Sequence, residues 1–194
     1  MAHRERADAA RNRRAILLAA HRLICENGID QVSMSDIAAE AGVGKGTLFR
    51  RFGDRAGLVN ALFEQLTEDW EPDALAALAD SGTDPAGRAV AFLAGLFDRI
   101  TVPGRPLLRA MGNHATPDRM RRYRTWQSAL AAVIAEARPG LPEEETAFTA
   151  HVLLGTLRAD FVDLLSGGGM TVEEIRTRIL AHADRVIRSG PSGG

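Results

Sequence analysis

Apolar side chains recur along almost the whole chain at the three- and four-residue spacing of an α-helix. The first such group consists of Ile16, Leu17, Ala20, Leu23 and Ile24. This spacing places all five on one face of a helix. Aromatic residues make up only 5% of the chain, and no stretch alternates apolar and polar residues for long enough to indicate a strand. The pattern therefore predicts an all-α protein.

Helix-capping residues divide this pattern into about nine helices. Residues 33–36 (SMSD) resemble a capping box, and residues 171–174 (TVEE) form one, so each segment is expected to begin a helix. The dipeptides at 84–85 and 116–117 each place an Asp or Thr directly before a proline. Proline is well tolerated at the first position of a helix, so these dipeptides predict two more helix starts.

Three further boundaries follow from proline and glycine. The dipeptide Pro-Gly at 103–104 is expected to separate one helix from a short helical segment around 107–111. Residues 142–165 are expected to form one long helix that ends at the three glycines 167–169. Residues 189–194 are expected to form a flexible tail.

The composition excludes several classes of protein. A single cysteine, Cys25, excludes a disulfide framework, and the five histidines lie too far from it for zinc-ligand spacing. No metal or cofactor is therefore expected. No apolar run approaches the roughly 20 residues that span a bilayer, so we expect a cytoplasmic protein with no membrane partner. Cys25 itself is expected to be a small core residue of the first helix.

The charge is unevenly distributed. Residues 1–60 hold ten Lys or Arg against seven Asp or Glu, a formal charge of +3, whereas the remainder carries −4. One basic cluster, at residues 4–14, is expected to form an N-terminal arm. The other lies at residues 45–55 and contains Lys45, Arg50, Arg51 and Arg55. Residues 1–60, here called the head, are thus basic, whereas the remainder of the chain is acidic. This asymmetry suggests a polyanionic partner for the head.

The second and third helices of the head have the spacing of a helix-turn-helix. The link between them is a Gly-Val-Gly-Lys sequence at residues 42–45. Gly42 allows the chain to leave the second helix with a positive φ, and Val43, Leu48 and Phe52 are expected to face the core. The residues left off the core side are Lys45, Thr47, Arg50 and Arg51. A DNA major groove could meet these side chains.

The segment SMSDIAAEAGVGKGTLFRRFGDRAGL, from Ser33 to Leu58, resembles the DNA-binding signature of tetracycline-repressor-type (TetR) transcriptional regulators. The chain length and the helical remainder also fit this family. The resemblance implies a helix-turn-helix DNA-binding domain with a basic N-terminal arm over residues 1–55. It also implies a helical effector-binding and dimerisation domain over residues 56–188.

The resemblance implies a set of DNA contacts in the head. They are Ser33, Ser35, Lys45, Gly46, Thr47, Phe49, Arg50, Arg51 and Arg55. In this set Lys45 would reach base edges, Thr47 a phosphate, and the arginine pair either bases or phosphates. Phe49 stands where the family usually has tyrosine, so it offers only apolar contact. Arg55, at the start of the fourth helix, would bind a phosphate, as would the serines that open the second helix.

The same resemblance implies a small-molecule effector, a homodimer and a pseudo-palindromic double-stranded DNA operator. The dimer is expected to form through the last two helices, Pro142–Ser166 and Thr171–Arg188. Candidates for the effector pocket are Phe97, Arg109, Met111, His114, Tyr123, Trp126, His151, Arg158 and Phe161. His151 and Arg158 would either bind an anionic group of the effector or pair with acidic residues across the dimer interface.

Two other functions compete with a ligand-responsive repressor. An enzyme is not expected, because no Ser-His-Asp or Cys-His arrangement stands out in the sequence. The sequence around 44–47 suggests a phosphate-binding loop, but it lacks the spacing of that motif and no strand precedes it. A module whose head binds another protein remains an alternative, and its binding would not depend on salt.

Overall fold

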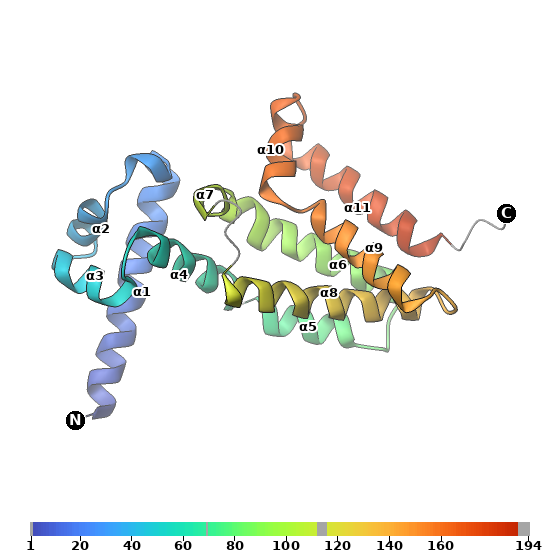
Figure 1. Ribbon diagram of the computed structural model, residues 1–194, viewed down its shortest axis with the longest axis horizontal. Helices are drawn as coiled ribbons and strands as arrows, with labels where there is room; N and C mark the ends of the chain where they lie inside the picture. Colours follow the sequence, from blue (N-terminus) through green and yellow to red (C-terminus); the bar gives the residue numbers. More distant parts are fainter. Residues whose placement is uncertain (1, 69, 112–115, 190–194) are drawn as a thin grey trace. The chain divides into compact units, whose positions relative to one another are not determined.

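The computed structural model of the protein describes residues 2–68, 70–111 and 116–189 (Figure 1). These residues form eleven α-helices, a 3₁₀ turn and a π-helical segment, and they include no strand. The predicted all-α fold is confirmed. The described residues divide into two compact units, one of residues 2–66 with 104–111 and the other of 67–103 with 116–189. The domain boundary at residue 55 remains a prediction.

The first unit contains the helix-turn-helix. Its elements are α1 (Ala2–Asn27), η1 (Ile29–Gln31), α2 (Met34–Glu40), α3 (Lys45–Phe52), α4 (Arg55–Glu68) and most of α7 (Val102–Met111). The apolar face predicted for the first helix is buried at Ile16, Leu17, Ala20 and Ile24. Leu48 of α3 and Leu58 of α4 are also fully buried, so these helices contribute side chains to the core of the unit.

The helix-capping and turn signals predicted for α2, α3 and the start of α4 are confirmed. Ser33 and Asp36 form a complete capping box at the start of α2, and Gly42 has a φ of +65° between α2 and α3. The carboxylate of Asp54 accepts a hydrogen bond from the backbone N–H of Gly57 at 2.8 Å, which caps the start of α4. Short-range hydrogen bonds thus determine where α2 and α4 begin.

The expected basic arm at residues 4–14 remains a prediction, and the structure places these residues in α1, which begins at Ala2. No proline or glycine interrupts the chain before Gly28, and Ala and Arg favour the helix strongly. The expectation that Cys25 is a core residue is wrong: Cys25 is exposed, since it lies about 100° around the helix from the buried Ile24.

The second unit is built around two central helices, α6 and α8. Its elements are α5 (Glu71–Ala79), α6 (Pro85–Leu96), η2 (Phe97–Thr101), α8 (Pro117–Ala137), α9 (Glu143–Gly155), α10 (Ala159–Gly167) and α11 (Val172–Arg188). In Figure 1, α5 lies against α6 and α8, α9 against α8, and α11 against α6. The predicted N-caps are confirmed at Asp84, Thr116 and Thr171.

The prediction of one long helix over residues 142–165 is wrong. The helix stops at Gly155 and restarts at Ala159 as α10. The Thr101 hydroxyl of η2 donates a hydrogen bond to the Leu157 carbonyl at 3.0 Å, and both residues are buried. This carbonyl is therefore bonded to a residue 56 positions away instead of to the next helical turn.

The predicted interruption at Pro103-Gly104 is also wrong. The π-helical segment η2 follows α6 directly, and α7 begins at Val102 without a loop. Pro103 lies directly after this π segment, inside a continuous helical path, and it lacks the backbone N–H that would bond the preceding turn. The wider π turn before it shifts the hydrogen-bond register, which lets the helical path continue past the proline.

Replacing Thr101 with valine should destabilise the second unit. Thr101→Val keeps the shape of the side chain but removes the donor to the buried Leu157 carbonyl, so we expect a decrease of about 1–3 kcal/mol in the free energy of unfolding. Thr125→Val is the matched control, because the exposed Thr125 hydroxyl bonds a carbonyl of its own helix. Urea denaturation measures both variants. If Thr101→Val and Thr125→Val have the same free energy of unfolding, a tertiary cause for the break between α9 and α10 is contradicted.

Candidate nucleic-acid interface

The recognition-helix candidate α3 has one buried side and one exposed side. Leu48 is fully buried, whereas Lys45, Gly46, Phe49 and Arg50 are exposed. Helix α3 contains no acidic residue, so its exposed side carries only positive charge, a glycine and an aromatic ring. Cations and one apolar ring on the same helix face can contact phosphates, base edges and thymine methyl groups.

The serines at the start of α2 differ in their surroundings. The Ser33 hydroxyl donates to the Asp36 carboxylate at 2.7 Å and accepts from the Asp36 backbone N–H at 3.2 Å. These hydrogen bonds lower the pKa of Asp36 below its usual value. The Ser33 hydroxyl is therefore already engaged in the helix cap. Ser35 is exposed, and Thr47 of α3 is half-buried.

Arg55 has hydrogen bonds within the head that the sequence did not indicate. Its guanidinium donates to the Val32 carbonyl at 3.0 Å and also to the Ile29 carbonyl. Both acceptors lie in the segment that leads into α2. These long-range hydrogen bonds, over 23 and 26 positions, have no local sequence signal. Ion pairs of Arg22 with Glu40 and of Arg13 with Glu64 connect α1 to α2 and to α4.

Three of the effector-pocket candidates gather on one side of the second unit. A hydrogen bond of 2.7 Å joins the Tyr123 hydroxyl to His151 Nδ1, and the two rings stack with centroids 5.6 Å apart. Burial raises the pKa of Tyr123, and the nearby charge of Arg158 opposes this rise. Arg158 forms a bidentate ion pair with Asp160 of the same chain, at 3.0 and 2.8 Å.

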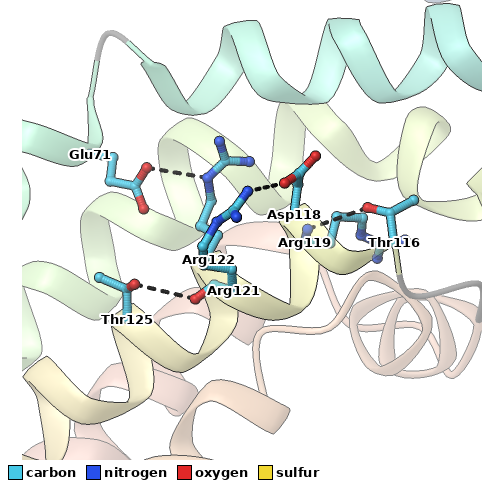
Figure 2. Close-up of polar contacts among 7 residues, drawn as sticks. All are labelled: Glu71, Thr116, Asp118, Arg119, Arg121, Arg122 and Thr125. Carbon is cyan, nitrogen blue, oxygen red and sulfur yellow. Dashed lines mark hydrogen bonds and ion pairs between the residues drawn. The ribbon is translucent and has the colours of Figure 1, made fainter.

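The start of α8 carries a row of arginines (Figure 2). Arg121 pairs with Asp118 one turn away, and Arg122 Nε donates to Glu71 of α5 at 3.2 Å. Burial, and then the charge of Arg158, lower the pKa of Arg119. Glu71 also accepts a hydrogen bond from Trp126 Nε1 at 2.6 Å. Sequence reasoning missed the role of Glu71, because its partners lie more than 50 positions away.

The remaining candidates for the effector pocket lie on several elements and differ in burial. Phe97 is fully buried in η2, Trp126 is buried in α8, and Phe161 of α10 is 37% exposed. Arg109 and Met111 belong to α7, but their side chains lie outside the described part, and His114 lies outside the described residues altogether. Among the described candidates, the structure therefore brings Tyr123 and His151 into contact, with Arg158 nearby.

Helices α9 and α10 carry four large apolar side chains that are exposed. These residues, here called the α9–α10 face, are Phe148, Val152, Phe161 and Leu164. Phe148 is 64% and Leu164 71% exposed. In α11, by contrast, the apolar residues face inward: Ile175, Ile179, Ala183 and Ile187 are buried.

No group of three or more His, Cys, Asp or Glu side chains among the described residues could hold a metal ion. No helix in the described ranges has the length and apolarity that crossing a membrane requires.

Comparison with known sequences identifies the head. The sequence profile of the tetR family of bacterial regulatory proteins matches residues 16–62, a range that includes all of α2 and α3. The HTH-type transcriptional regulator TtgR of Pseudomonas putida is 30% identical over 105 residues, which cover 54% of this chain and 50% of TtgR. The chain thus spans about half the length of this curated relative.

Comparison with solved structures extends the likeness of fold to most of the chain. A TetR-family transcriptional regulator from Syntrophomonas wolfei has a TM-score of 0.70 at 16% identity, and the match covers 93% of this chain and 97% of that one. The TetR-like regulator LfrR from Mycobacterium smegmatis, solved in complex with proflavine, has a TM-score of 0.60 at 21% identity and coverages of 96% and 99%. The matched head and this fold confirm the predicted resemblance to the tetR family of bacterial regulatory proteins.

Proposed function

We propose that the protein is a sequence-specific DNA-binding transcriptional regulator, and that it acts as a ligand-responsive repressor in the bacterial cytoplasm. The observation that carries this proposal is the exposed side of α3, which combines cations with an aromatic ring and has no acidic residue. The match of residues 16–62 to the tetR family supports it. The relatives are transcriptional regulators rather than enzymes.

In this proposal α3 enters the major groove. Lys45, at the start of α3, contacts base edges, and Arg50 and Arg51 contact phosphates or bases. Phe49 packs against a thymine methyl group or a sugar, because its exposed ring has no hydroxyl to bind a phosphate. Gly46 has no heavy atom within 4 Å of its Cβ position, so the DNA backbone can approach α3 closely there.

A second copy of the chain is the partner that we assign to the α9–α10 face. A single helix-turn-helix makes few phosphate contacts, and two-fold pairing places two recognition helices about 34–36 Å apart on one side of the DNA. The α9–α10 face lies on the first of the two helical segments expected to form the dimer. Four apolar residues of α11, namely Ile175, Ile179, Ala183 and Ile187, are already buried within the chain, so we assign α11 a secondary role at the rim of the interface.

The effector proposal centres on Tyr123, His151 and Arg158. A tyrosine hydroxyl, an imidazole and a guanidinium are suited to bind an anionic or strongly polar group. LfrR, which has the same fold, was solved with the small molecule proflavine, and this supports a small-molecule effector here. Binding of the effector is proposed to weaken the affinity of the dimer for its operator, a coupling that is typically worth about 1–3 kcal/mol.

A binding experiment tests the proposed function. Purified protein is titrated against a labelled duplex that covers the intergenic DNA beside its own gene, with excess random DNA and over a salt series. We expect binding that survives the competitor, saturates at two chains per site and weakens as salt rises, because phosphate contacts release counterions. Binding that is independent of salt, or no binding at low salt, would contradict the proposal.

Two substitutions in α3 should separate base contacts from phosphate contacts. Lys45→Ala should change which operator sequence is preferred, with a weakening of about 1–3 kcal/mol for the native operator and little effect on random DNA. Arg50→Ala should weaken binding to both kinds of duplex similarly. Competition assays with a set of operator variants measure both effects. Equal weakening by the two variants on every duplex would refute this division of roles.

A further inference from the structure

The first turn of α4 contacts the chain on both sides of the α2–α3 pair. At one end, Arg55 donates hydrogen bonds to the carbonyls of Ile29 and Val32, directly before the Ser33 cap of α2. At the other end, Gly57 lies so close to the carbonyl of Phe52, the last residue of α3, that no Cβ would fit between them. The entrance to α2 and the exit from α3 thus meet the same helical turn.

We propose that Arg55 is a positioning residue for DNA recognition, whose guanidinium holds the segment before α2 so that the first turn of α4 fixes both ends of α2–α3. This inference rests on the proposed DNA-binding function. It assigns Arg55 a different task from the phosphate contact that the family resemblance implies. The side chains of Ile29 and Val32 are buried, which anchors the same segment in the core of the first unit.

The chemistry of arginine suits this task better than that of lysine. The planar guanidinium presents N–H donors on separate nitrogen atoms, so it can bridge two carbonyls at once. The ammonium group of lysine is a single point charge, which can bind a phosphate equally well but cannot hold the same two carbonyls in a fixed arrangement. Comparing the two side chains at position 55 therefore separates a positioning role from a charge contact.

The test uses Arg55→Lys and Arg55→Gln in the full-length protein, with Arg50→Lys and Arg50→Gln as matched controls on the exposed side of α3. The first measurement is hydrogen exchange of the free protein at the amides of Gln31, Val32 and Asp36, which are bonded within this segment and the α2 cap. Both Arg55 variants should exchange about tenfold faster, as expected when hydrogen bonds of about 1 kcal/mol or more are removed. Neither Arg50 variant should change these rates.

The second measurement is the affinity for the operator duplex over a salt series. Arg55→Lys and Arg55→Gln should weaken binding to a similar extent, by about tenfold, and leave the dependence of log Kd on log salt unchanged. Arg50→Gln should reduce that slope by about 0.9 for each phosphate that is no longer neutralised, and Arg50→Lys should restore it. Rescue of binding by Arg55→Lys, together with a reduced slope for Arg55→Gln, would overturn the proposal.

The two measurements separate this inference from the proposed function. If the unaltered protein binds no duplex, the DNA-binding function fails, while exchange in the free protein still decides whether Arg55 holds the segment. Unchanged exchange rates in both Arg55 variants would overturn the positioning role even if operator binding is normal.

Discussion

Gly57→Ala should unfold or displace the helix-turn-helix. A methyl group at Gly57 would overlap the backbone carbonyl of Phe52, and no flexible side chain can move aside to make room. Only Gly53 and Asp54 separate α3 from α4, so Phe52 cannot retreat without moving α3. We expect a decrease of about 1–3 kcal/mol in the free energy of unfolding of the first unit, and operator binding at least about tenfold weaker.

Gly46→Ala is the matched control for this prediction. Gly46 also lies in the first turn of a helix, but its Cβ position has no heavy atom within 4 Å, and its φ is ordinary. Alanine there should leave stability unchanged or raise it by about 0.5–1 kcal/mol, because glycine is a poor helix former. Chemical denaturation followed by circular dichroism measures both variants. If Gly57→Ala is as stable as the parent protein, the close approach of α3 to α4 does not constrain the head.

Phe148→Glu should convert the protein from a dimer to a monomer. The ring is 64% exposed in the single chain, so folding of the chain should change by no more than about 0.5 kcal/mol. In the proposed dimer the same position is buried, and an unpaired carboxylate there costs several kcal/mol. We therefore expect half the molar mass in sedimentation equilibrium and operator binding about a hundredfold weaker, since one head alone reaches only half of the phosphates.

Leu18→Glu controls for the introduction of an acidic residue at an exposed apolar position. Leu18 is 59% exposed but belongs to α1 in the first unit, so this variant should remain a dimer. Leu164→Glu, on the α9–α10 face, should behave as Phe148→Glu does. A dimer that persists in both α9–α10 variants at micromolar concentration would show that the two copies pair elsewhere.

The features that the sequence alone determined are those with local causes. The capping box at Ser33 and Asp36 and the positive φ of Gly42 depend on atoms within a few residues, so the pattern predicted the limits of α2 and α3. The periodicity of apolar residues predicted the buried face of α1. The same local motif carried the family resemblance, whereas the individual DNA and effector contacts remain predictions, since each depends on a binding partner.

Other features depend on partners far along the chain and therefore on how the helices pack. The break between α9 and α10 coincides with the hydrogen bond between Thr101 and the Leu157 carbonyl, which joins residues 56 positions apart. Arg55 similarly bonds carbonyls more than 20 positions away. Periodicity and capping report the interactions of a residue with its near neighbours, but a buried carbonyl needs a donor from whichever element the fold brings beside it. Such a pairing is determined only when the helices pack together.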